Sequence, residues 1–161
     1  MPTAGEPTSM FDTVVIATDG SESVKRAVAV ALDLSERFDA TVHALYVIDA
    51  SEVESSPESV RDQFHDALEE SAQEALAQVE DETDLSVQTA IREGRPAGEI
   101  CAFAREVDAD VVATGTRGRH GENRFLIGSV AERVVRTCPV PVLTVRQLDE
   151  GERGDDAATE A

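Results

Sequence analysis

Short, unbroken apolar runs alternate along the chain with longer stretches in which apolar residues recur every three or four positions. Five of the short runs have the length of β-strands: 11–18, 41–48, 85–91, 111–114 and 140–145. Four amphipathic helices are predicted between them: 24–38, 57–79, 96–103 and a last one that begins at Ser129. Because strands that alternate with helices pair in parallel through crossover connections, the pattern predicts a doubly wound α/β domain with a five-stranded parallel sheet.

The helical spacing also predicts which side chains of the first two helices face the core. In the first helix these are Val24, Ala27, Val28, Ala31 and Leu32. In the second helix they are Val60, Phe64, Ala67, Leu68, Ser71, Ala72, Ala75 and Val79. The other face of the second helix consists mainly of carboxylates, so we expect water to cover it.

The composition fits one domain and narrows the range of partners. The 161 residues hold 33 acidic and 14 basic side chains, which gives a formal charge of -19 and a pI near 4.3. Nucleic acid and anionic membrane surfaces attract basic proteins, so neither is an expected partner. No apolar run is long enough to span a membrane, and residues 1–10 lack the features of a signal peptide, so we expect a cytoplasmic protein.

The acidic residues are spread over the whole chain, among periodic valine, leucine and isoleucine residues that a disordered acidic chain would lack. This distribution favours a folded domain with carboxylate-covered faces, as in halophilic proteins, whose net charge maintains solubility in a salt-rich cytoplasm. The alternative is an ordinary acidic bacterial protein.

A glycine-containing loop joins the fourth predicted strand to the last helix. At Gly115 and Gly118 the backbone can take positive φ or let a ligand approach with no Cβ in the way. Gly128 then precedes the helix, for which Ser129 is a candidate cap. Because the free N–H groups of a first helical turn attract anions, the segment predicts a phosphate-binding site. The alternative is a surface connection that binds no ligand.

The same loop reverses the charge of the chain locally. Between Gly115 and the helix lie one acid, Glu122, and three arginines: Arg117, Arg119 and Arg124. A solvated loop of so acidic a protein should itself be acidic. The arginines therefore predict an anionic ligand, since guanidinium groups offer a fork of donors to phosphate.

The glycines and the serine have a specific spacing: glycine, two residues, glycine, nine residues, glycine, serine. With this spacing, and with IATDGSE, LYVID, EGRPAGEI and CPVPVLTVR in that order, the chain resembles the ATP-binding members of the universal stress protein family over about residues 11–147. The resemblance implies a Rossmann-like sheet with strand order 3-2-1-4-5. Strands one and four would then lie side by side, with Asp19 and Gly115 facing each other across the crevice where ligands bind.

The resemblance further implies ATP as ligand, with or without Mg²⁺, and a set of nucleotide-contacting residues. It puts Ala17, Thr18 and Val47 around the base and Asp19 near the nucleoside, although Asp19 has a turn aspartate and Val47 a core valine as alternatives. The phosphate end would comprise the loop and the helix start, where backbone N–H groups of Gly128, Ser129 and Val130 are expected to hold the inner phosphates. The remaining residues of the predicted site are Thr114, Gly115, Thr116, Arg117, Gly118 and Arg124.

No pattern identifies a catalytic residue or a metal ligand. The first predicted strand continues as DGSES, which is neither GxGxxG nor GK[ST], and the loop holds no lysine. We therefore favour a cytoplasmic ATP-binding universal stress protein that acts as a nucleotide-dependent stress-response regulator or binding module. One alternative is a slow ATPase or phosphotransferase in the same pocket, with Ser129 and Thr116 as reachable hydroxyls. Another is a dimeric scaffold with no nucleotide.

The cysteines and histidines are scattered. Cys101 and Cys138 have no companion at metal-ligand spacing, so we expect free thiols that pack as small hydrophobic residues. The three histidines are His43, His65 and His120. None stands with a carboxylate or cysteine in a recognisable ligand motif, and only the last, in the glycine loop, is a functional candidate.

The ends of the chain differ from its middle. We expect a domain of residues 11–147 between two unordered tails, 1–10 and 148–161, the second of which is acidic. The last predicted strand, from Val140 to Val145, closes the sheet and leaves an open edge. A second copy running antiparallel would cover this edge and form a homodimer, as the family resemblance also implies, and a hydrated monomer is the alternative.

The excess of carboxylates leads to a first prediction. Because 33 acidic side chains on one compact surface repel each other when screening is weak, the melting temperature should be many degrees higher in about 3 M than in about 0.1 M KCl. Thermal melts followed by circular dichroism measure this difference. An unchanged melting temperature would remove the halophilic interpretation.

Overall fold

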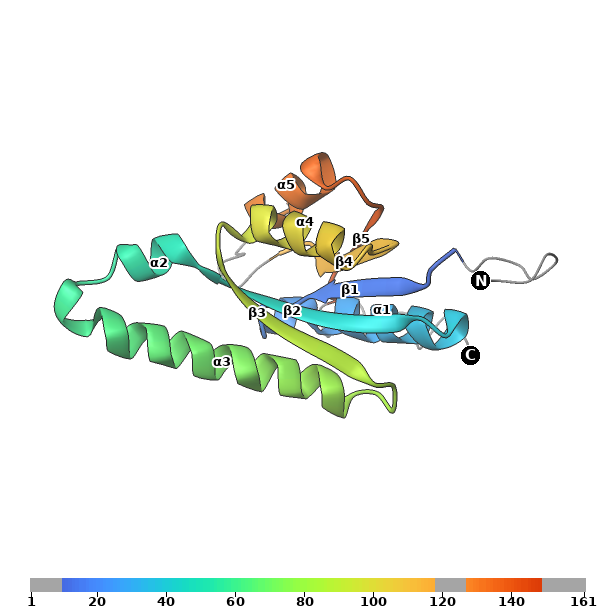
Figure 1. Ribbon diagram of the computed structural model, residues 1–161, viewed down its shortest axis with the longest axis horizontal. Helices are drawn as coiled ribbons and strands as arrows, with labels where there is room; N and C mark the ends of the chain where they lie inside the picture. Colours follow the sequence, from blue (N-terminus) through green and yellow to red (C-terminus); the bar gives the residue numbers. More distant parts are fainter. Residues whose placement is uncertain (1–9, 118–126, 149–161) are drawn as a thin grey trace.

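The structure is a computed structural model, which describes residues 10–117 and 127–148 and has a single sheet at its centre (Figure 1). The strands are β1 (Thr13–Ala17), β2 (Thr41–Asp49), β3 (Val87–Gly94), β4 (Val111–Gly115) and β5 (Val142–Val145). Their order is β3-β2-β1-β4-β5, and all neighbouring strands are parallel. The doubly wound sheet and its strand order are therefore confirmed.

Helices cover both faces of the sheet. They are α1 (Lys25–Phe38), α2 (Ala50–Glu54), α3 (Arg61–Asp81), α4 (Pro96–Glu106) and α5 (Ser129–Thr137), with the 3-10 turns η1 (Glu22–Val24) and η2 (Glu58–Val60). Figure 1 shows α1 and α3 on one face and α4 and α5 on the other. Every helix in the two described ranges is too short or too polar to span a bilayer.

The central strands contribute to two cores at once. Val14 and Ile16 of β1 pack into the core beneath α1 and α3, whereas Val15 and Ala17 pack into the core beneath α4 and α5. All four side chains are buried. Successive strand residues point to opposite faces, so a strand between two helical layers must be apolar throughout. This explains the unbroken apolar run at the start of the chain.

The predicted helix faces are mostly confirmed. The five core positions of the first helical segment are all buried, as are Leu68, Ala72, Ala75 and Val79 of α3. The prediction was wrong for Val60, Ala67 and Ser71, which are exposed, and it missed Leu76, which is buried. Val60 and Ala67 are exposed because the amino end of α3 extends past the sheet towards α2 (Figure 1). Ser71 and Leu76 show that the buried stripe is turned slightly from the predicted one, since it runs through Leu68, Ala72, Ala75, Leu76 and Val79.

Several strand boundaries differ from the prediction by one to three residues, and for β3 and β5 the physical reason is clear. β3 begins at Val87 and continues to Gly94, because it pairs with β2 up to Asp49. Its charged end resembles a loop in the sequence, but an edge strand tolerates outward charges. β5 begins at Val142, after two prolines that cannot donate a ladder hydrogen bond. The carbonyl of Pro141 still accepts from the N–H of Val112, at 2.9 Å.

The prediction also missed α2, which follows β2 without a break. Asp49 caps this short helix by accepting hydrogen bonds from the backbone N–H and the hydroxyl of Ser51, at 3.0 and 2.7 Å. The long helix correspondingly begins at Arg61 and not at Pro57. A five-residue helix is too short to produce a recognisable apolar period, so the sequence contains no pattern that would predict it.

One carboxylate fastens the beginning of β1 to the beginning of β4. Oδ2 of Asp110 accepts hydrogen bonds from the backbone N–H groups of Asp12 and Thr13, at 2.8 and 2.9 Å. The N–H of Asp110 in turn donates to the carbonyl of Thr13 at 2.8 Å. These bonds fix the register in which Val14 lies opposite Val111.

Candidate ligand-binding pocket

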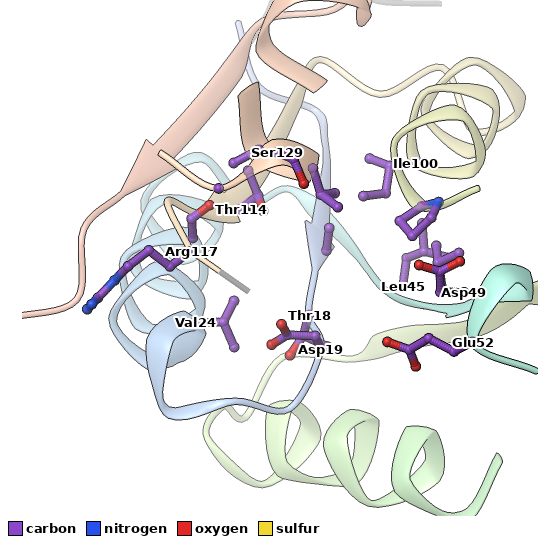
Figure 2. Close-up of a pocket in the computed structure, with 17 residues that line it drawn as sticks. Thr18, Asp19, Val24, Leu45, Asp49, Glu52, Ile100, Thr114, Arg117 and Ser129 are labelled. Atoms are coloured by element: carbon purple, nitrogen blue, oxygen red, sulfur yellow. Dashed lines mark hydrogen bonds between the residues drawn. The ribbon is translucent and has the colours of Figure 1, made fainter. Parts of the chain in front are cut away.

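A pocket of about 270 Å³ lies at the carboxyl ends of β1, β2 and β4 (Figure 2). In a doubly wound sheet this edge carries the ligand crevice, at the point between β1 and β4 where the winding reverses. The start of α4 and the start of α5 form the remaining walls.

Ten of the thirteen predicted site residues line this pocket: Ala17, Thr18, Asp19, Val47, Thr114, Gly115, Arg117, Gly128, Ser129 and Val130. Thr116 does not line it but lies beside it in the chain. Gly118 and Arg124 are outside the described residues, as are Arg119, His120 and Glu122 of the loop. The structure thus brings most of the predicted residues together, while their role in binding a nucleotide stays a prediction.

The end of β1 is a turn held by its own side chains. The N–H of Thr18 donates to the carbonyl of Leu45 at 2.9 Å and extends the ladder to β2. Oδ1 of Asp19 accepts from the N–H and the hydroxyl of Ser21, at 3.0 and 2.6 Å. Asp19 is therefore the turn aspartate that the sequence left as an alternative, and it lines the pocket as well. The turn passes through Gly20, whose φ of 75° favours glycine.

The two described glycines at the ends of the loop differ in what they require. A Cβ on Gly115 would lie 3.0 Å from the carbonyl oxygen of Ser23, so this position is glycine because η1 packs closely against the end of β4. Gly128 has φ -65° and ψ 157°, an extended conformation that any residue can adopt. Positive φ, one of the two reasons offered for Gly115, therefore does not apply there.

The start of α5 differs in detail from the predicted anion site. Gly128, and not Ser129, is the N-cap, and no side chain caps the helix. The N–H of Gly128 donates to the carbonyl of Thr116 at 2.6 Å, so it is not available for phosphate. The next N–H groups, from Ser129 to Ala131, belong to the first turn and have no acceptor within the helix. They lie at the pocket wall.

The pocket has opposite charge at its two ends. Three carboxylates line one side: those of Asp19, Asp49 and Glu52. The start of α5, with its positive helix dipole, and Arg117 border the other side. Figure 2 shows Ser129 and Thr114 across the pocket from Asp19 and Glu52. Apolar side chains, including those of Leu45 and Ile100, line the space between them.

Arg117 has the chemistry of an anion ligand. Its Nε is buried and has no hydrogen-bond partner among the described residues. A buried donor without an acceptor is destabilising, so this side chain favours an anionic acceptor. In Figure 2 its side chain extends away from Thr18 and Asp19, and its guanidinium group points outward from the other labelled residues of the pocket.

Sequence reasoning missed seven lining residues: Val24, Leu45, Asp49, Glu52, Pro96, Ile100 and Ala131. Asp49 could have been found, because it ends the second strand just as Asp19 follows the first. The apolar residues could not, because a valine or leucine beside a pocket has the same sequence pattern as one in the core. Glu52 belongs to α2, which the sequence did not predict.

A doubly wound sheet with a crevice between β1 and β4, walled by a helix start, defines a class of α/β ligand-binding domains. The chain belongs to the universal stress protein family, whose model matches residues 10–146. A universal stress protein of Methanocaldococcus jannaschii is 38% identical over 143 residues, which cover 86% of this chain and 84% of the relative. The resemblance seen in the sequence is thereby confirmed at the level of the family.

Solved structures of the family have the same fold. The universal stress protein UspA from Lactobacillus plantarum matches with a TM-score of 0.74 and 25% identity, over 84% of this chain and 98% of that one. A universal stress protein solved in complex with cAMP has a TM-score of 0.62, 24% identity and coverages of 86% and 98%. One from Archaeoglobus fulgidus, in complex with dAMP, has a TM-score of 0.61, 20% identity and coverages of 85% and 99%.

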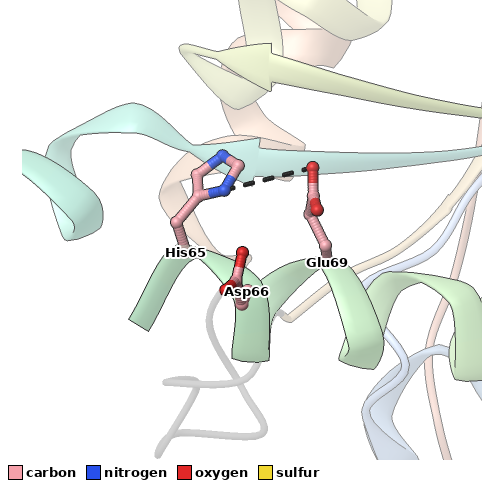
Figure 3. Close-up of side chains that lie close together, drawn as sticks. All are labelled: His65, Asp66 and Glu69. Atoms are coloured by element: carbon pink, nitrogen blue, oxygen red, sulfur yellow. Dashed lines mark ion pairs between the residues drawn. The ribbon is translucent and has the colours of Figure 1, made fainter. Parts of the chain in front are cut away.

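A second cluster of ionisable side chains lies on α3, outside the pocket. Ligand atoms of His65, Asp66 and Glu69 lie within 4.8 Å of one another (Figure 3). Nε2 of His65 is 2.8 Å from Oε2 of Glu93 on β3, and Nδ1 is 4.0 Å from Oε1 of Glu69. The sequence predicted no ligand motif around a histidine, and it did not reveal these ion pairs of His65. The spacing of four residues between His65 and Glu69 was the available signal.

The carboxylates make the imidazole of His65 a better base. The hydrogen bond with Glu93 raises the pKa of His65, and the charges of Glu93, Glu69 and Asp66 act in the same direction. When it is protonated, the ring is the cation of this cluster and ties α3 to β3. A raised pKa works against a metal ion, which binds the neutral ring.

This cluster predicts a pH-dependent contribution to stability. Because the folded-state pKa is raised above its ordinary value of 6.5, the contribution is fully present below that value and is lost as the pH rises through the folded-state pKa. The melting temperature of His65→Gln should therefore fall furthest below wild type near about pH 6 and approach it near about pH 9.

Glu93→Gln is the matched control, because it removes the main cause of the shift and leaves the ring in place. In this background the pH dependence of the His65→Gln effect should shrink. A difference between wild type and His65→Gln that stays the same from acid to alkaline pH would contradict the ion-pair argument.

Proposed function

We propose that the pocket binds an adenine nucleotide, with ATP as the ligand, and that the protein is a cytoplasmic stress-response regulator or binding module governed by nucleotide occupancy. The observation that carries the proposal is the division of the pocket into a positive end and an acidic end with apolar walls between them. A nucleotide has the complementary sequence of parts: phosphates, a ribose with hydroxyl groups, and a flat base.

The positive end suits the phosphates. In a protein of formal charge -19, a polyanion would be repelled unless the site supplies local compensation. The first-turn N–H groups of α5 and the buried, unpartnered Nε of Arg117 provide donors there. The three carboxylates would repel phosphates, so the nucleoside part of the ligand should lie beside them.

The acidic end and the apolar walls suit the nucleoside. Carboxylates accept hydrogen bonds from hydroxyl groups, and Asp19 and Asp49 follow adjacent strands at that end of the pocket. Val47, Pro96 and Ile100 give an apolar surface for the base. The family structures in complex with cAMP and dAMP support an adenine nucleotide as the class of ligand, although their likeness to this chain is one of fold.

The proposal makes binding, rather than turnover, the activity of the site. Asp19 already accepts two hydrogen bonds from Ser21, so its carboxylate holds the turn after β1 in position. No lining residue among the described ones combines with another as a hydrogen-bonded base and nucleophile. A slow ATPase or phosphotransferase stays the alternative, and release of ADP from the titrated samples would reveal it.

Gly128→Val tests the phosphate end. The backbone at this position accepts any residue, so the fold should be retained, while a branched side chain at the pocket wall obstructs the ligand. The affinity for ATP should fall at least about tenfold, which corresponds to about 1.4 kcal/mol. Isothermal titration calorimetry in high salt measures it, with circular dichroism as the check of folding.

Gly98→Val is the matched control. Gly98 lies on α4, nothing lies within 4 Å of its missing Cβ, and ATP affinity should be unchanged. Adenosine has no phosphates, so its affinity should be much less sensitive to Gly128→Val than that of ATP. Equal binding of ATP to wild type and Gly128→Val would place the ligand elsewhere. A wild type that binds neither ATP nor adenosine would overturn the proposed function.

We also propose that two chains pair through β5. This strand is at one edge of the sheet, and Val142, Leu143 and Thr144 are only half-buried. An edge strand with apolar side chains is normally covered, and a second copy running antiparallel would satisfy its free backbone groups.

Light scattering in high salt tests this dimer. Wild type should have about twice the chain mass of 17.2 kDa. Thr144→Pro should reduce the mass to that of one chain, since the N–H of Thr144 is on the open side of β5, whereas Thr144→Val keeps the N–H group and should remain dimeric. A single-chain mass for wild type excludes the dimer, and a dimer that survives the proline requires another interface.

A further inference from the structure

The two cysteines, distant in the sequence, meet where α4 packs against α5. Cys101 is a buried residue of α4. Its Sγ lies 3.8 Å from Oγ1 of Thr137, the last residue of α5. Cys138 follows directly as the C-cap of α5, where its N–H donates to the carbonyl of Val134 at 2.9 Å. Both cysteines are free thiols, as predicted.

The surroundings of the two thiols differ. Cys101 is 5% exposed, whereas Cys138 is only half-buried. Burial raises the pKa of Cys138, the backbone N–H of Val140 opposes this change, and a hydrogen bond with the Cys101 side chain raises the pKa again. Arg105 acts in the same direction as Val140. The pKa of the more accessible thiol is therefore raised overall, with one donor and one positive charge that partly oppose the change, and it follows Thr137, which contacts Cys101.

We propose that Cys101 and Cys138 form a reversible dithiol–disulfide pair that responds to peroxide and links α4 to the end of α5. Cys138 is the residue that peroxide reaches, because it is the more exposed of the two. Cys101 is the buried partner that resolves the product.

The chemistry needs one equivalent of hydrogen peroxide. The Cys138 thiolate attacks one peroxide oxygen, the O–O bond breaks, and hydroxide leaves and takes up the proton released by the thiol, which gives a sulfenic acid and one water. Cys101 then attacks the Cys138 sulfur, the S–O bond breaks and a second water leaves. Two thiols lose two electrons and two protons in total, and peroxide is reduced to two waters. A dithiol reductant reverses the reaction by exchange.

The bond would act on the helices that border the pocket. Pro96 and Ile100 of α4, and Ser129 and Val130 of α5, are lining residues. Cys101 directly follows Ile100 in the chain. A disulfide places its sulfur atoms about 2.05 Å apart, so it would hold the two helices together from the side away from the ligand. This inference does not depend on which ligand the pocket takes.

Oxidation of the purified, fully reduced full-length protein with hydrogen peroxide in high salt tests the pair. Both thiols of each chain should be lost together, and the intact mass should fall by about 2 Da, the two hydrogens removed. Trypsin should then release one cross-linked product that joins peptide 93–105 to peptide 137–146. A dithiol reductant should restore both thiols. The reaction should be faster at alkaline pH, because the thiolate is the nucleophile.

Cys101→Ser and Cys138→Ser are the controls, each with its fold checked by circular dichroism. Cys101→Ser should accumulate oxygen adducts on Cys138, since the resolving thiol is gone, and Cys138→Ser should keep its buried thiol reduced for longer. Three results in wild type would overturn the proposal: thiols that survive peroxide, separate oxygen adducts with no cross-link, or a disulfide only between chains. The wild-type measurements decide the matter even if a variant does not fold.

Discussion

The pairing of β1 with β4 determines where the pocket lies. Asp110 joins the beginnings of the two strands through its carboxylate and its own N–H, and the register follows from these bonds. With the beginnings fixed, the strand ends bring Thr18 and Gly115 to the same edge of the sheet. Because one strand leads to α1 and the other towards α5, the chain leaves this edge on opposite faces and a crevice remains between them.

The charges in this crevice differ from those of the acidic surface around it. Most acidic side chains can be understood as a solvated surface, which identifies no ligand. The pocket departs from that background in two ways, because it has donors at one end and gathers three carboxylates at the other. A binding site for a simple anion would need only the first feature. The combination favours a ligand that carries both phosphates and hydroxyl groups.

The sequence predicted the sheet, its helices and most of the pocket because these depend on strong local patterns. Buried strands such as β1 and β4 are apolar throughout, and α1 follows the helical period at every core position. The failures were of another kind. The helix α2 is too short to show an apolar period, whereas the Thr116–Gly128 hydrogen bond and the pairing of His65 with Glu93 depend on contacts between segments. The close approach of the η1 backbone, which requires glycine at position 115, is likewise a contact between segments and could not be predicted.

The two cores of the domain are unequal in size. The core beneath α1 and α3 contains many more buried side chains than the core beneath α4 and α5, within the described residues. Local opening is easiest where few apolar contacts must be broken. The layer of α4 and α5 should therefore exchange its amide hydrogens earlier than α1 and α3 do. Since that layer also forms one side of the pocket, the site joins a wall with fewer buried neighbours to the densely packed ends of β1 and β2.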